Sequence, residues 1–479
     1  MSTTTTITGV HISGASIDPT EPWVIPVTEP TTGTTLYNLA GGGAEDARRA
    51  LNAALRTFAD FAVTPAAQRA NMLRAIAADL REGSTREQIA VLISKETGKR
   101  VSESRAEVDL SARFFDWFAA LIDTRHNKTW TVIPGIDHTV TQRPLGVVAV
   151  LTPWNFPVSI PARKIAPALA AGCTVLFKPS EVAPASALRL AEIVEAHVPA
   201  GVINTVLGEP ASVVEPWLAH PAVRGLTFTG STRVGKLLAA QTAPHFIRCV
   251  FELGGNAPFV MLDDADVDRA VELLMIAKYR NNGQSCIAAN QAWVPDPLVD
   301  EFVEAFAAAT NNLVLGDPLN DETTLGPLAL PSDPNRITSL IDNAESAGTK
   351  IIRSTVRVPA TGHFAGPAIC VNPPAENSIV SDEIFGPVIS VRGYHDLNQV
   401  VTATRDTRYG LGGYIIGNPT RARILADALD VAIVGVNTAT PNTPQVPFGG
   451  LKYSGIGWEG GEVGLDAFVT QQTVATSAR

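Results

Sequence analysis

The chain has 479 residues, which is more than one typical domain holds, so we expect two or more domains of about 100 to 200 residues each. Apolar residues make up 45% and charged residues 18%, the profile of a folded protein rather than a disordered one. The net charge of -10 argues against nucleic acid as a partner, because phosphate binding requires clustered Lys and Arg, and it favours small molecules.

The sequence carries no recognisable signal for export, membrane insertion or metal binding. The N-terminal stretch "MSTTTTITGVHISG" lacks the basic and apolar regions of a secretory signal. The longest apolar run, Ile165 to Phe177, is shorter than the roughly 18 to 20 residues that span a bilayer. The cysteines are widely spaced and form no pair or Cys/His cluster. We therefore expect a cytoplasmic protein with reduced thiols, no membrane segment and no metal.

The first predicted elements are helices. From Glu45 to about Asp123, apolar residues recur at intervals of three and four, which predicts a helical layer. Within it, "ETGKR" at Glu96 to Arg100 is not a phosphate loop, because the upstream glycine is missing and Arg100 replaces the required Ser or Thr. Between Lys128 and Arg143, β-branched residues on both sides of a Pro-Gly turn predict a hairpin that could serve as an arm.

After the hairpin, short apolar strands alternate with helices. This alternation predicts βαβ units and a parallel sheet with helices on both faces. The strands are expected at "GVVAVLT", "TVLFK", "INTVLG", "GLTFTG" and "RCVFELG", with helices at about Ile160 to Ala171, at about Ala185 to His197 and after Ser231. Ligands bind such sheets beyond the carboxyl ends of the strands, where "PWN", "KPSE" and "TGSTRVG" fall.

The remaining chain predicts a second α/β region and a terminal strand. The second region begins near Gly254 and runs to about Asn437. The Gly-rich "PFGGLKYSGIGWEGG" follows it, and the tail "AFVTQQTVATSA" has the alternation of a strand that could pair with another chain.

Two pairs of residues that could contact a nucleotide lie just after predicted strands. Gly230 and Ser231 open a helix, where free N–H groups and the helix dipole favour an anionic phosphate, although ordinary capping by Ser231 explains the same pattern. Lys178 and Glu181 follow a buried strand and could bond ribose hydroxyls, with a solvated salt bridge as the alternative. Taken alone, neither pair establishes a nucleotide site.

Glu252 and Cys286 are the candidates for catalytic chemistry. Glu252 ends the strand "RCVFE", where burial would raise its pKa and suit it to act as a base; a structural partner of a buried cation is the alternative. Cys286, in "RNNGQSCIAAN", could be a nucleophile if the turn delivers its sulfur to a helix N-terminus. A lone cysteine is more often a small core residue.

Taken together, the motifs resemble those of the NAD(P)-dependent aldehyde dehydrogenase superfamily from about Pro30 to the tail. They occur in family order, and the 34 residues between Glu252 and Cys286 match the family interval. The matching motifs are "PWNFP" at Pro153 to Pro157, "KPSEVAP" at Lys178 to Pro184, "FTGSTRVG" at Phe228 to Gly235, "FELGG" at Phe251 to Gly255, "GQSC" at Gly283 to Cys286, "LGDP" at Leu315 to Pro318, "EIFGPV" at Glu383 to Val388 and "PFGGLKYSG" at Pro447 to Gly455.

The resemblance implies a catalytic role for four residues. Cys286 is the expected nucleophile, and the Asn155 side chain with the Cys286 backbone N–H is the expected oxyanion hole. Glu252 is expected to activate the water that hydrolyses the thioester. Glu459, in "WEGGEVGL", matches a family glutamate that helps to relay the proton.

The resemblance also implies NAD as the cofactor, with NADP as the alternative. Because Glu181 would repel a 2′-phosphate, we expect NAD to be favoured. The expected cofactor-binding residues are Thr152, Trp154, Lys178, Pro179, Ser180, Glu181, Gly208, Gly230, Ser231, Leu253, Glu383 and Phe385.

Arg163 and Arg280 bear on the substrate. They match the positions at which succinate-semialdehyde dehydrogenases, the most similar members of the superfamily, carry two arginines that bind the distal carboxylate. Paired guanidiniums suit this role because each offers bidentate donors in a fixed geometry. The alternative is that these arginines form interdomain or subunit ion pairs.

The architecture implied by the resemblance is α/β, with three units. A Rossmann-like NAD domain is expected in residues 1–123 and 144–253, a catalytic domain in 254–440, and a small β oligomerisation domain in 124–143 and 441–479. Exchanged arms of this kind imply a homodimer or a homotetramer.

Three functions are compared on this basis. The leading prediction is NAD-dependent oxidation of succinate semialdehyde or a related semialdehyde to a carboxylic acid. A broad dehydrogenase of uncharged aliphatic or aromatic aldehydes is the second, and a cysteine-dependent esterase or thioesterase is the alternative from another class.

Overall fold

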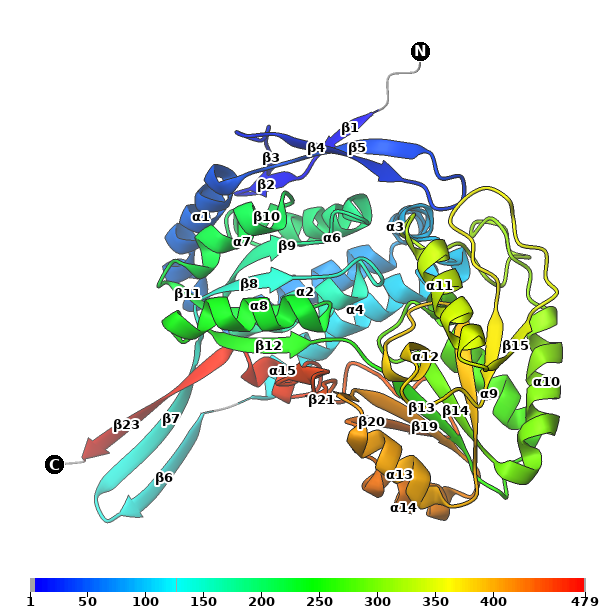
Figure 1. Cartoon of the computed structure of the whole chain (residues 1–479). Helices are drawn as coiled ribbons and strands as arrows, with labels where there is room; N and C mark the ends of the chain where they lie inside the picture. Colours follow the sequence, from blue (N-terminus) through cyan, green and yellow to red (C-terminus); the bar gives the residue numbers. More distant parts are fainter. Residues whose placement is uncertain (1–4, 126, 478–479) are drawn as a thin grey trace.

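Two large sheets, each covered by helices on both faces, make up most of the computed structural model, which describes residues 5–125 and 127–477 (Figure 1). The first sheet has the strand order β22-β12-β11-β8-β9-β10-β2-β3. Its strands are β2 (Val10–Ile12), β3 (Ala15–Ser16), β8 (Val147–Leu151), β9 (Thr174–Lys178), β10 (Ile203–Val206), β11 (Val223–Thr229), β12 (Arg248–Glu252) and β22 (Gly455–Ile456).

The strands β12, β11, β8, β9 and β10 pair in parallel, which confirms the sheet predicted from the alternation of strands and helices. Successive side chains of a strand point to opposite faces, so a strand covered on both sides must be apolar throughout. In β8, Val148 and Val150 pack into one core, whereas Val147, Ala149 and Leu151 pack into the other. The apolar sequence of β8 therefore reflects its position inside the sheet.

Helices cover this sheet in two layers. On one face lie α5 and α6 with the helices α2 to α4 outside them, and on the other lie α1, α7 and α8. Their bounds are α1 (Ala44–Ala62), α2 (Ala66–Arg81), α3 (Gly83–Thr97), α4 (Val101–Thr124), α5 (Ser159–Ala171), α6 (Pro184–His197), α7 (Pro210–Leu218) and α8 (Thr232–Thr242), with a short 3-10 turn η1 (Ala243–His245). The predicted helical layer and the helices at 160, 185 and 231 are confirmed.

The N-terminal segment forms strands that the sequence did not reveal. A small sheet, in the order β1-β5-β4, consists of β1 (Thr6–Thr8), β4 (Trp23–Thr28) and β5 (Thr35–Gly41), and β2 and β3 extend the edge of the first large sheet. β1, β2 and β3 are only two or three residues long and give no periodic signal, whereas β4, with the sequence WVIPVT, and β5 are longer and were overlooked.

The second large sheet has the order β15-β16-β17-β14-β13-β19-β20. Its strands are β13 (Ala257–Met261), β14 (Ala289–Pro295), β15 (Lys350–Arg353), β16 (Ala368–Val371), β17 (Val388–Tyr394), β19 (Gly412–Ile416) and β20 (Ile433–Val436). The helices are α9 (Val267–Tyr279) and α10 (Val299–Asn311) on one face, α13 (Leu397–Asp406) and α14 (Pro419–Ala428) on the other, with α11 (Asp333–Ser346), α12 (Ser378–Ser381), η2 (Arg280–Gly283) and η3 (Asp296–Leu298) around them. The predicted second α/β region is confirmed.

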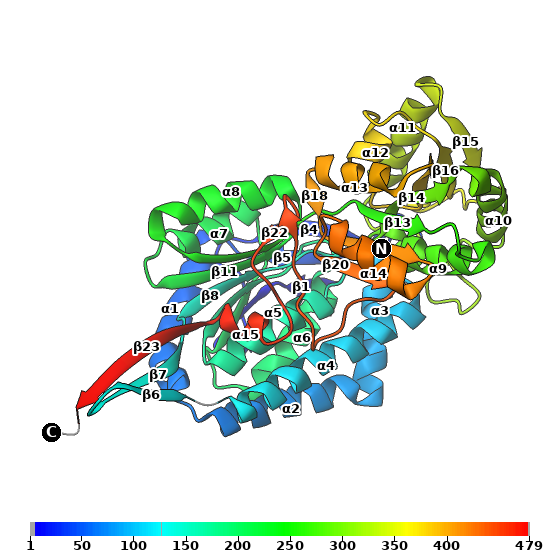
Figure 2. The same cartoon turned by 90° about the horizontal axis from the view of Figure 1, so that it is seen from below.

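An antiparallel arm projects from the body of the molecule in both views (Figures 1 and 2). It consists of β6 (Lys128–Ile133), β7 (Ile136–Pro144) and β23 (Val469–Ser477), in the order β23-β7-β6. The predicted hairpin and terminal strand are therefore confirmed. The strand β23 pairs along its whole length with β7 of its own chain, which leaves the outer edges of β23 and β6 without a neighbouring strand in the described residues.

Three short elements remain in the part of the chain that the structure describes. They are α15 (Val463–Asp466) and the two-stranded pair β18 (Tyr409–Gly410) and β21 (Leu451–Lys452). The strand β22 comes from the segment expected in the oligomerisation domain, yet it pairs with β12. Among residues 5–125 and 127–477, no helix is both long enough and apolar enough to cross a membrane.

Candidate active site

The ends of four parallel strands bring the first predicted site residues together. The strands β9, β8, β11 and β12 are neighbours, so their carboxyl ends lie along one edge of the sheet. Lys178 ends β9, Thr152 follows β8, Thr229 ends β11 and Glu252 ends β12. The hydroxyls of Thr152 and Thr229 are buried without a hydrogen-bond partner, so this edge presents polar groups that a ligand could satisfy.

Cys286 lies in the loop that connects α9 to β14. A 3-10 turn precedes it, and within this turn Asn281 and Asn282 adopt positive φ angles of 52° and 58°. Asparagine tolerates this left-handed conformation better than most residues. Both side chains hold the turn in place, since the amide of Asn281 donates to the carbonyl of Gln284 at 2.9 Å and the amide of Asn282 donates to the carbonyl of Gly98 at 2.9 Å.

The sequence made a nucleophilic Cys286 conditional on a helix N-terminus at the end of the turn, and no helix starts there. The chain passes from the turn into the strand β14 rather than into a helix, whereas the first residues of α5, Ser159 and Ile160, line the same cavity as Cys286. Burial raises the pKa of the Cys286 thiol to about 12, and the negative charge of Glu383 adds to this shift while Arg163 opposes it. The thiol is therefore protonated at neutral pH, and nucleophilic attack requires a group that accepts its proton.

Cys286 forms the common wall of two cavities. The first cavity, of about 240 Å³, is also lined by Trp154, Asn155, Gly230, Ser231, Leu253, Glu383 and Phe385. The second is narrower, about 40 Å³, and its lining includes Phe114, Phe156, Arg163, Arg280 and Phe448. Cys286 is the one residue that belongs to both linings. The sulfur thus lies between a space for one reactant and a space for another.

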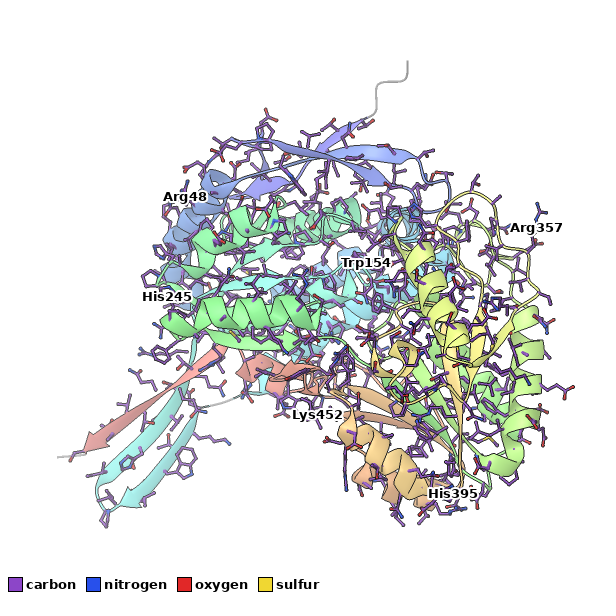
Figure 3. The ribbon with its side chains drawn as sticks, in the orientation of Figure 1. Arg48, Trp154, His245, Arg357, His395 and Lys452 are labelled. Carbon is purple, nitrogen blue, oxygen red and sulfur yellow. The ribbon has the colours of Figure 1, made fainter. Side chains whose placement is uncertain are left out.

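The first cavity collects half of the residues expected to bind the cofactor. The rings of Trp154 and Phe385 meet edge to face, with their centroids 5.6 Å apart, and Trp154 lies where the two large sheets meet (Figure 3). The carboxylate of Glu383 accepts the N–H of Gly255 at 3.0 Å, and burial raises its pKa to about 7. Ser231 caps α8 through the N–H of Val234 at 3.3 Å.

The other expected cofactor residues lie outside the wall of this cavity. Lys178 and Glu181 form an ion pair at 3.4 Å. Pro179 and Ser180 lie between them, and the Ser180 hydroxyl accepts the N–H of Val182 at 3.3 Å. Gly208 follows β10, and a Cβ there would lie 2.0 Å from the carbonyl oxygen of Gly42. The missing side chain at Gly208 therefore permits contact between two backbone segments of this chain.

Glu252 and Glu459 lie outside the walls of both cavities and form a buried cluster with Lys164 and with Arg163, which also lines the second cavity. Glu459 accepts hydrogen bonds from Lys164 and from the Thr227 hydroxyl, the latter at 3.1 Å, and its second oxygen lies 2.7 Å from Nε of Arg163. Burial alone would raise the pKa of Glu459, but Lys164 and Arg163 together hold it below its ordinary value. Glu459 is therefore an ionised carboxylate.

Glu252 is the opposite case. Both of its carboxylate oxygens are buried without a hydrogen-bond partner in the described structure. Burial raises its pKa well above the ordinary value, the negative charge of Glu459 raises it further, and Arg163 and Lys164 act against the shift. A buried carboxyl with an elevated pKa and free oxygens is suited to accept and release protons.

Asn155 is held by residues that the sequence did not single out. Its side-chain amide donates to the carbonyl of Gln284 at 3.1 Å, and its own carbonyl accepts from Nζ of Lys99 at 2.8 Å. Lys99 is fully buried and bonded to Glu107, which also accepts the N–H groups of Val158 and Ser159 at the start of α5, at 3.0 and 3.1 Å. Lys99 lies in the "ETGKR" stretch, but nothing local indicates these distant contacts.

Arg163 and Arg280 line the second cavity together with Cys286. The guanidinium of Arg163 stacks on the ring of Phe448 at 4.1 Å, and that of Arg280 lies 5.6 Å from the ring of Phe156. In the described part of the chain, Arg280 has no carboxylate within ion-pair distance, whereas Arg163 has Glu459. The two positions thus share a cavity but differ in their partners.

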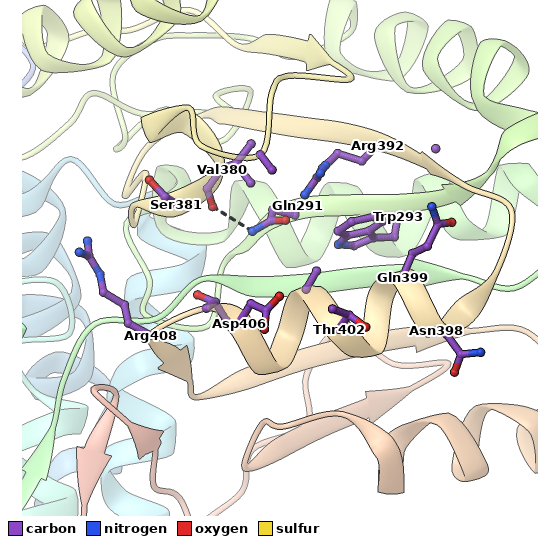
Figure 4. A pocket seen from close by; sticks show the side chains of 14 residues that line it. Gln291, Trp293, Val380, Ser381, Arg392, Asn398, Gln399, Thr402, Asp406 and Arg408 are labelled. Atoms are coloured by element: carbon purple, nitrogen blue, oxygen red, sulfur yellow. Dashed lines mark hydrogen bonds between the residues drawn. The ribbon is translucent and has the colours of Figure 1, made fainter.

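A wider depression of about 780 Å³ lies elsewhere, between α12, α13 and the strands β14 and β17 (Figure 4). Gln291 donates to the carbonyl of Val380 at 3.0 Å, and Arg392 stacks on Trp293 at 4.4 Å. None of the expected catalytic, cofactor or substrate residues lines it. Across residues 5–125 and 127–477, no three His, Cys, Asp or Glu side chains are grouped so as to hold a metal ion.

Comparisons with known proteins agree with this arrangement. The aldehyde dehydrogenase family model matches residues 17–474. A glutarate-semialdehyde dehydrogenase of Pseudomonas aeruginosa is 37% identical over 96% of this chain and 95% of that protein. A succinate-semialdehyde dehydrogenase [NADP(+)] of Escherichia coli is 36% identical over 96% of this chain and 95% of that protein.

The fold is likewise similar to solved structures of such enzymes. The crystal structure of a succinate-semialdehyde dehydrogenase from Burkholderia pseudomallei superposes with a TM-score of 0.95 at 35% identity, covering 98% of each chain. The chain therefore belongs to the aldehyde dehydrogenase family, and it is an NAD(P)-dependent oxidoreductase that acts on aldehydes.

Proposed function

We propose that the chain oxidises a short aldehyde with a distal carboxylate, succinate semialdehyde or a related semialdehyde, to the corresponding dicarboxylate. The observation that carries this proposal is the shared cavity of Cys286, Arg163 and Arg280. Two guanidiniums in one narrow cavity attract a carboxylate, and the small volume favours a short, unbranched chain. The names of the relatives from Pseudomonas aeruginosa and Escherichia coli, a glutarate- and a succinate-semialdehyde dehydrogenase, support the same class of substrate.

In the first half of the reaction, the sulfur of Cys286 adds to the aldehyde carbonyl and forms a thiohemiacetal. The thiol proton must leave, and Glu252 is a nearby carboxyl whose oxygens are free to take it. The Asn155 amide, together with the Cys286 N–H, stabilises the negative charge on the former carbonyl oxygen. Bound NAD(P)⁺ supplies the acceptor for the hydride that leaves the thiohemiacetal carbon, and a thioester remains on Cys286.

In the second half, water hydrolyses the thioester. Once Glu252 has released the thiol proton to solvent, the water oxygen bonds to the acyl carbon while Glu252 takes a proton from that water, and the carbon–sulfur bond breaks with the electron pair returning to sulfur. The carboxylic acid is then released. Glu459, hydrogen-bonded to Lys164 and Thr227, is the ionised neighbour that keeps the pKa of Glu252 high enough to accept this proton.

The residues of the first cavity fit a dinucleotide. The unpartnered hydroxyls of Thr152 and Thr229 and the start of α8 at Ser231 offer donors along the sheet edge. Lys178 and Glu181 would hold the adenosine ribose, and Trp154, Glu383 and Phe385 the nicotinamide half. Because the Glu181 carboxylate would repel a 2′-phosphate, we propose that NAD is preferred over NADP.

The arm supports a proposal about assembly. It exposes Trp130 and Val474, as well as strand edges with free N–H and C=O groups, which are the features of an association surface. We propose a homodimer, or a tetramer of two dimers, in which the arm contacts a second copy of this chain.

A broad dehydrogenase of uncharged aldehydes is the second candidate. The contact between Arg163 and Glu459 favours it, because an arginine already paired to a carboxylate can serve structure alone. A cysteine-dependent esterase would use Cys286 and Asn155 without a cofactor, so ester hydrolysis is expected at most as a side reaction.

The deciding experiment compares NADH formation from succinate semialdehyde and from butanal, each with NAD and with NADP. We expect a higher kcat/KM for the charged aldehyde, lowered by about tenfold to hundredfold in Arg163→Ala and in Arg280→Ala, because each loses hydrogen bonds to a charged group. Butanal should be affected much less by Arg280→Ala. Equal use of both aldehydes would replace the proposal by the broad dehydrogenase.

A further inference from the structure

Arg163 lies at the junction between the substrate cavity and the buried carboxylate cluster. Its Nε lies 2.7 Å from Oε2 of Glu459, although the N–H bond is not directed at the oxygen, so the contact is a charge pair rather than a hydrogen bond. The guanidinium also lies flat on Phe448 and lines the cavity of Cys286. In the described structure its terminal nitrogens form no hydrogen bond, so they remain available to a ligand.

The same cluster determines the charge around Glu252. Glu252 ends β12 beside β22, the strand that Glu459 follows, and Lys164 of α5 donates to Glu459 and, at 2.9 Å, to the Thr227 hydroxyl of β11, the strand next to β12. The charged groups that act on Glu252 are accordingly Glu459, Arg163 and Lys164. Glu252 and Cys286 also influence each other, since the Glu252 charge disfavours the thiolate. Arg280, from the other side of the substrate cavity, acts on Cys286 but is not among the charges that shift Glu252.

We propose that Arg163 is a positioning residue for the base Glu252 as well as a substrate ligand, so that the substrate carboxylate, by engaging Arg163, alters the charge that Glu252 experiences. This inference rests on the proposed function in that it takes Glu252 as the base of thioester hydrolysis. Arg280 shares the binding role without this second effect. The two arginines of the cavity are therefore not equivalent.

The direction of the effect follows from the sign of the charge. A nearby cation lowers the pKa of a carboxyl group, so removal of the Arg163 charge raises the pKa of Glu252. Lys164 still pairs with Glu459 and keeps it ionised. Glu252 accepts a proton only in its ionised form, so the rate of hydrolysis increases with pH as Glu252 ionises. This rising limb of the pH–rate profile moves to higher pH when the charge of Arg163 is removed by mutation or neutralised by a bound carboxylate.

The test measures hydrolysis of the acyl-enzyme directly. The full-length enzyme is acylated with butanal and NAD, quenched at successive times, and the loss of the thioester mass is followed between pH 5 and pH 10. In Arg163→Met we expect the limb to move upward by roughly one pH unit relative to the parent enzyme. Arg163→Lys, which restores the cation, should bring the limb back toward its original position.

Arg280→Met is the matched control, because it removes a cation from the same cavity. Its hydrolysis limb should stay where the parent enzyme has it, although its reaction with charged aldehydes weakens. In the parent enzyme, the limb for the acyl group from succinate semialdehyde should lie above that for butanal. The inference would be overturned if the butanal limb lay at the same pH in the parent enzyme, in Arg163→Met and in Arg280→Met. Equal shifts of this limb in Arg163→Met and Arg280→Met would overturn it as well.

Substrate preference is a separate readout. If the parent enzyme uses both aldehydes equally while only Arg163→Met moves the butanal limb, the proposed substrate is wrong but the positioning role of Arg163 holds. If charged aldehydes are preferred and the butanal limb does not move in Arg163→Met, the proposed substrate holds but the positioning role of Arg163 is wrong.

Discussion

At the scale of single residues, burial and charged neighbours govern the state of Cys286. Burial and the charge of Glu383 keep the thiol protonated, while Arg163 and Arg280 favour the thiolate. Glu383 has a pKa of about 7, so its negative charge is present above neutral pH and absent below. The reactivity of Cys286 toward an alkylating agent should therefore depend on Glu383.

This dependence gives a prediction for Glu383→Gln. Removing the negative charge lowers the pKa of Cys286 and increases the thiolate fraction, so alkylation by iodoacetamide at pH 8.5 should be roughly 3- to 10-fold faster than in the parent enzyme. At pH 6 the two rates should converge, because Glu383 is then protonated. Labelling is assigned by peptide mass spectrometry, with Cys286→Ala as the control. Identical rates at pH 8.5 would show that the Glu383 charge does not reach the sulfur.

The residues proposed as catalytic could be selected from the sequence, whereas the residues that support them could not. Cys286, Glu252 and Asn155 occur in recognisable motifs and are brought close together by the fold. Glu107 and Lys164 lie in ordinary helices and Lys99 in the loop between α3 and α4, and their roles depend on contacts between residues far apart in the chain. The sequence left open whether a helix starts at Cys286, and the structure has none there, because a turn with two left-handed asparagines leads into a strand.

At the scale of elements, helix α4 supports both loops of the site. Glu107 caps the start of α5 and is bonded to Lys99, which holds the backbone of Asn155. One turn earlier, Glu103 accepts the N–H of Asn281 at 3.1 Å in the turn before Cys286. A displacement of α4 would therefore move Asn155 and Cys286, the proposed oxyanion donor and nucleophile, together.

We predict that the Lys99–Glu107 pair is strongly coupled. Removing one partner leaves a buried charge uncompensated, so Lys99→Met or Glu107→Leu alone should each lower the free energy of unfolding by about 3 to 5 kcal/mol. The double variant should lose less than the sum of the two. Urea unfolding followed by tryptophan fluorescence measures all three.

The exposed pair of Arg105 and Glu87, anchored on the same helix, is the matched control. Its side chains are 33% and 45% exposed, so its removal should cost only about 0 to 1 kcal/mol. Additive losses for Lys99 and Glu107 would mean that the two charges act independently.

Element types followed from local patterns more readily than their pairing. The predicted hairpin and the terminal strand both form, since each has β-branched alternation around clear turn residues. The pairing of β23 with β7 joins the end of the chain to its first third, and no local pattern encodes such a contact. Among the N-terminal strands, β1 and β2 are too short, at three residues each, to give a periodic signal.

At the scale of the whole molecule, the arm is the part with the least support from its own chain. It projects from the body and exposes Trp130, Val132 and Val474 to 47%, 77% and 43%. Apolar side chains on an extended sheet with open edges are costly in water, so contact with a second copy would remove them from solvent.

We predict that the arm determines the assembly state. Truncation after Phe468 should lower the molar mass measured by size-exclusion chromatography with light scattering to that of a single chain. Because truncation also removes the partner of β7, the double variant Trp130→Ser and Val474→Ser provides a second test that keeps the strand. Val63→Ser, at an exposed apolar position on the body, should change nothing. An unchanged molar mass in both arm variants would exclude the arm from assembly.

The two cavities at Cys286 also have a consequence for how such an enzyme can change over generations. Their linings share no residue except Cys286, so substitutions around Leu110, Phe114 or Ile160 alter the aldehyde space without touching the residues that line the cofactor space. A mutation that admits a new aldehyde need not impair binding of the dinucleotide. Because the two linings can change independently, the same catalytic residues can come to act on new aldehydes through single substitutions that leave the dinucleotide site intact.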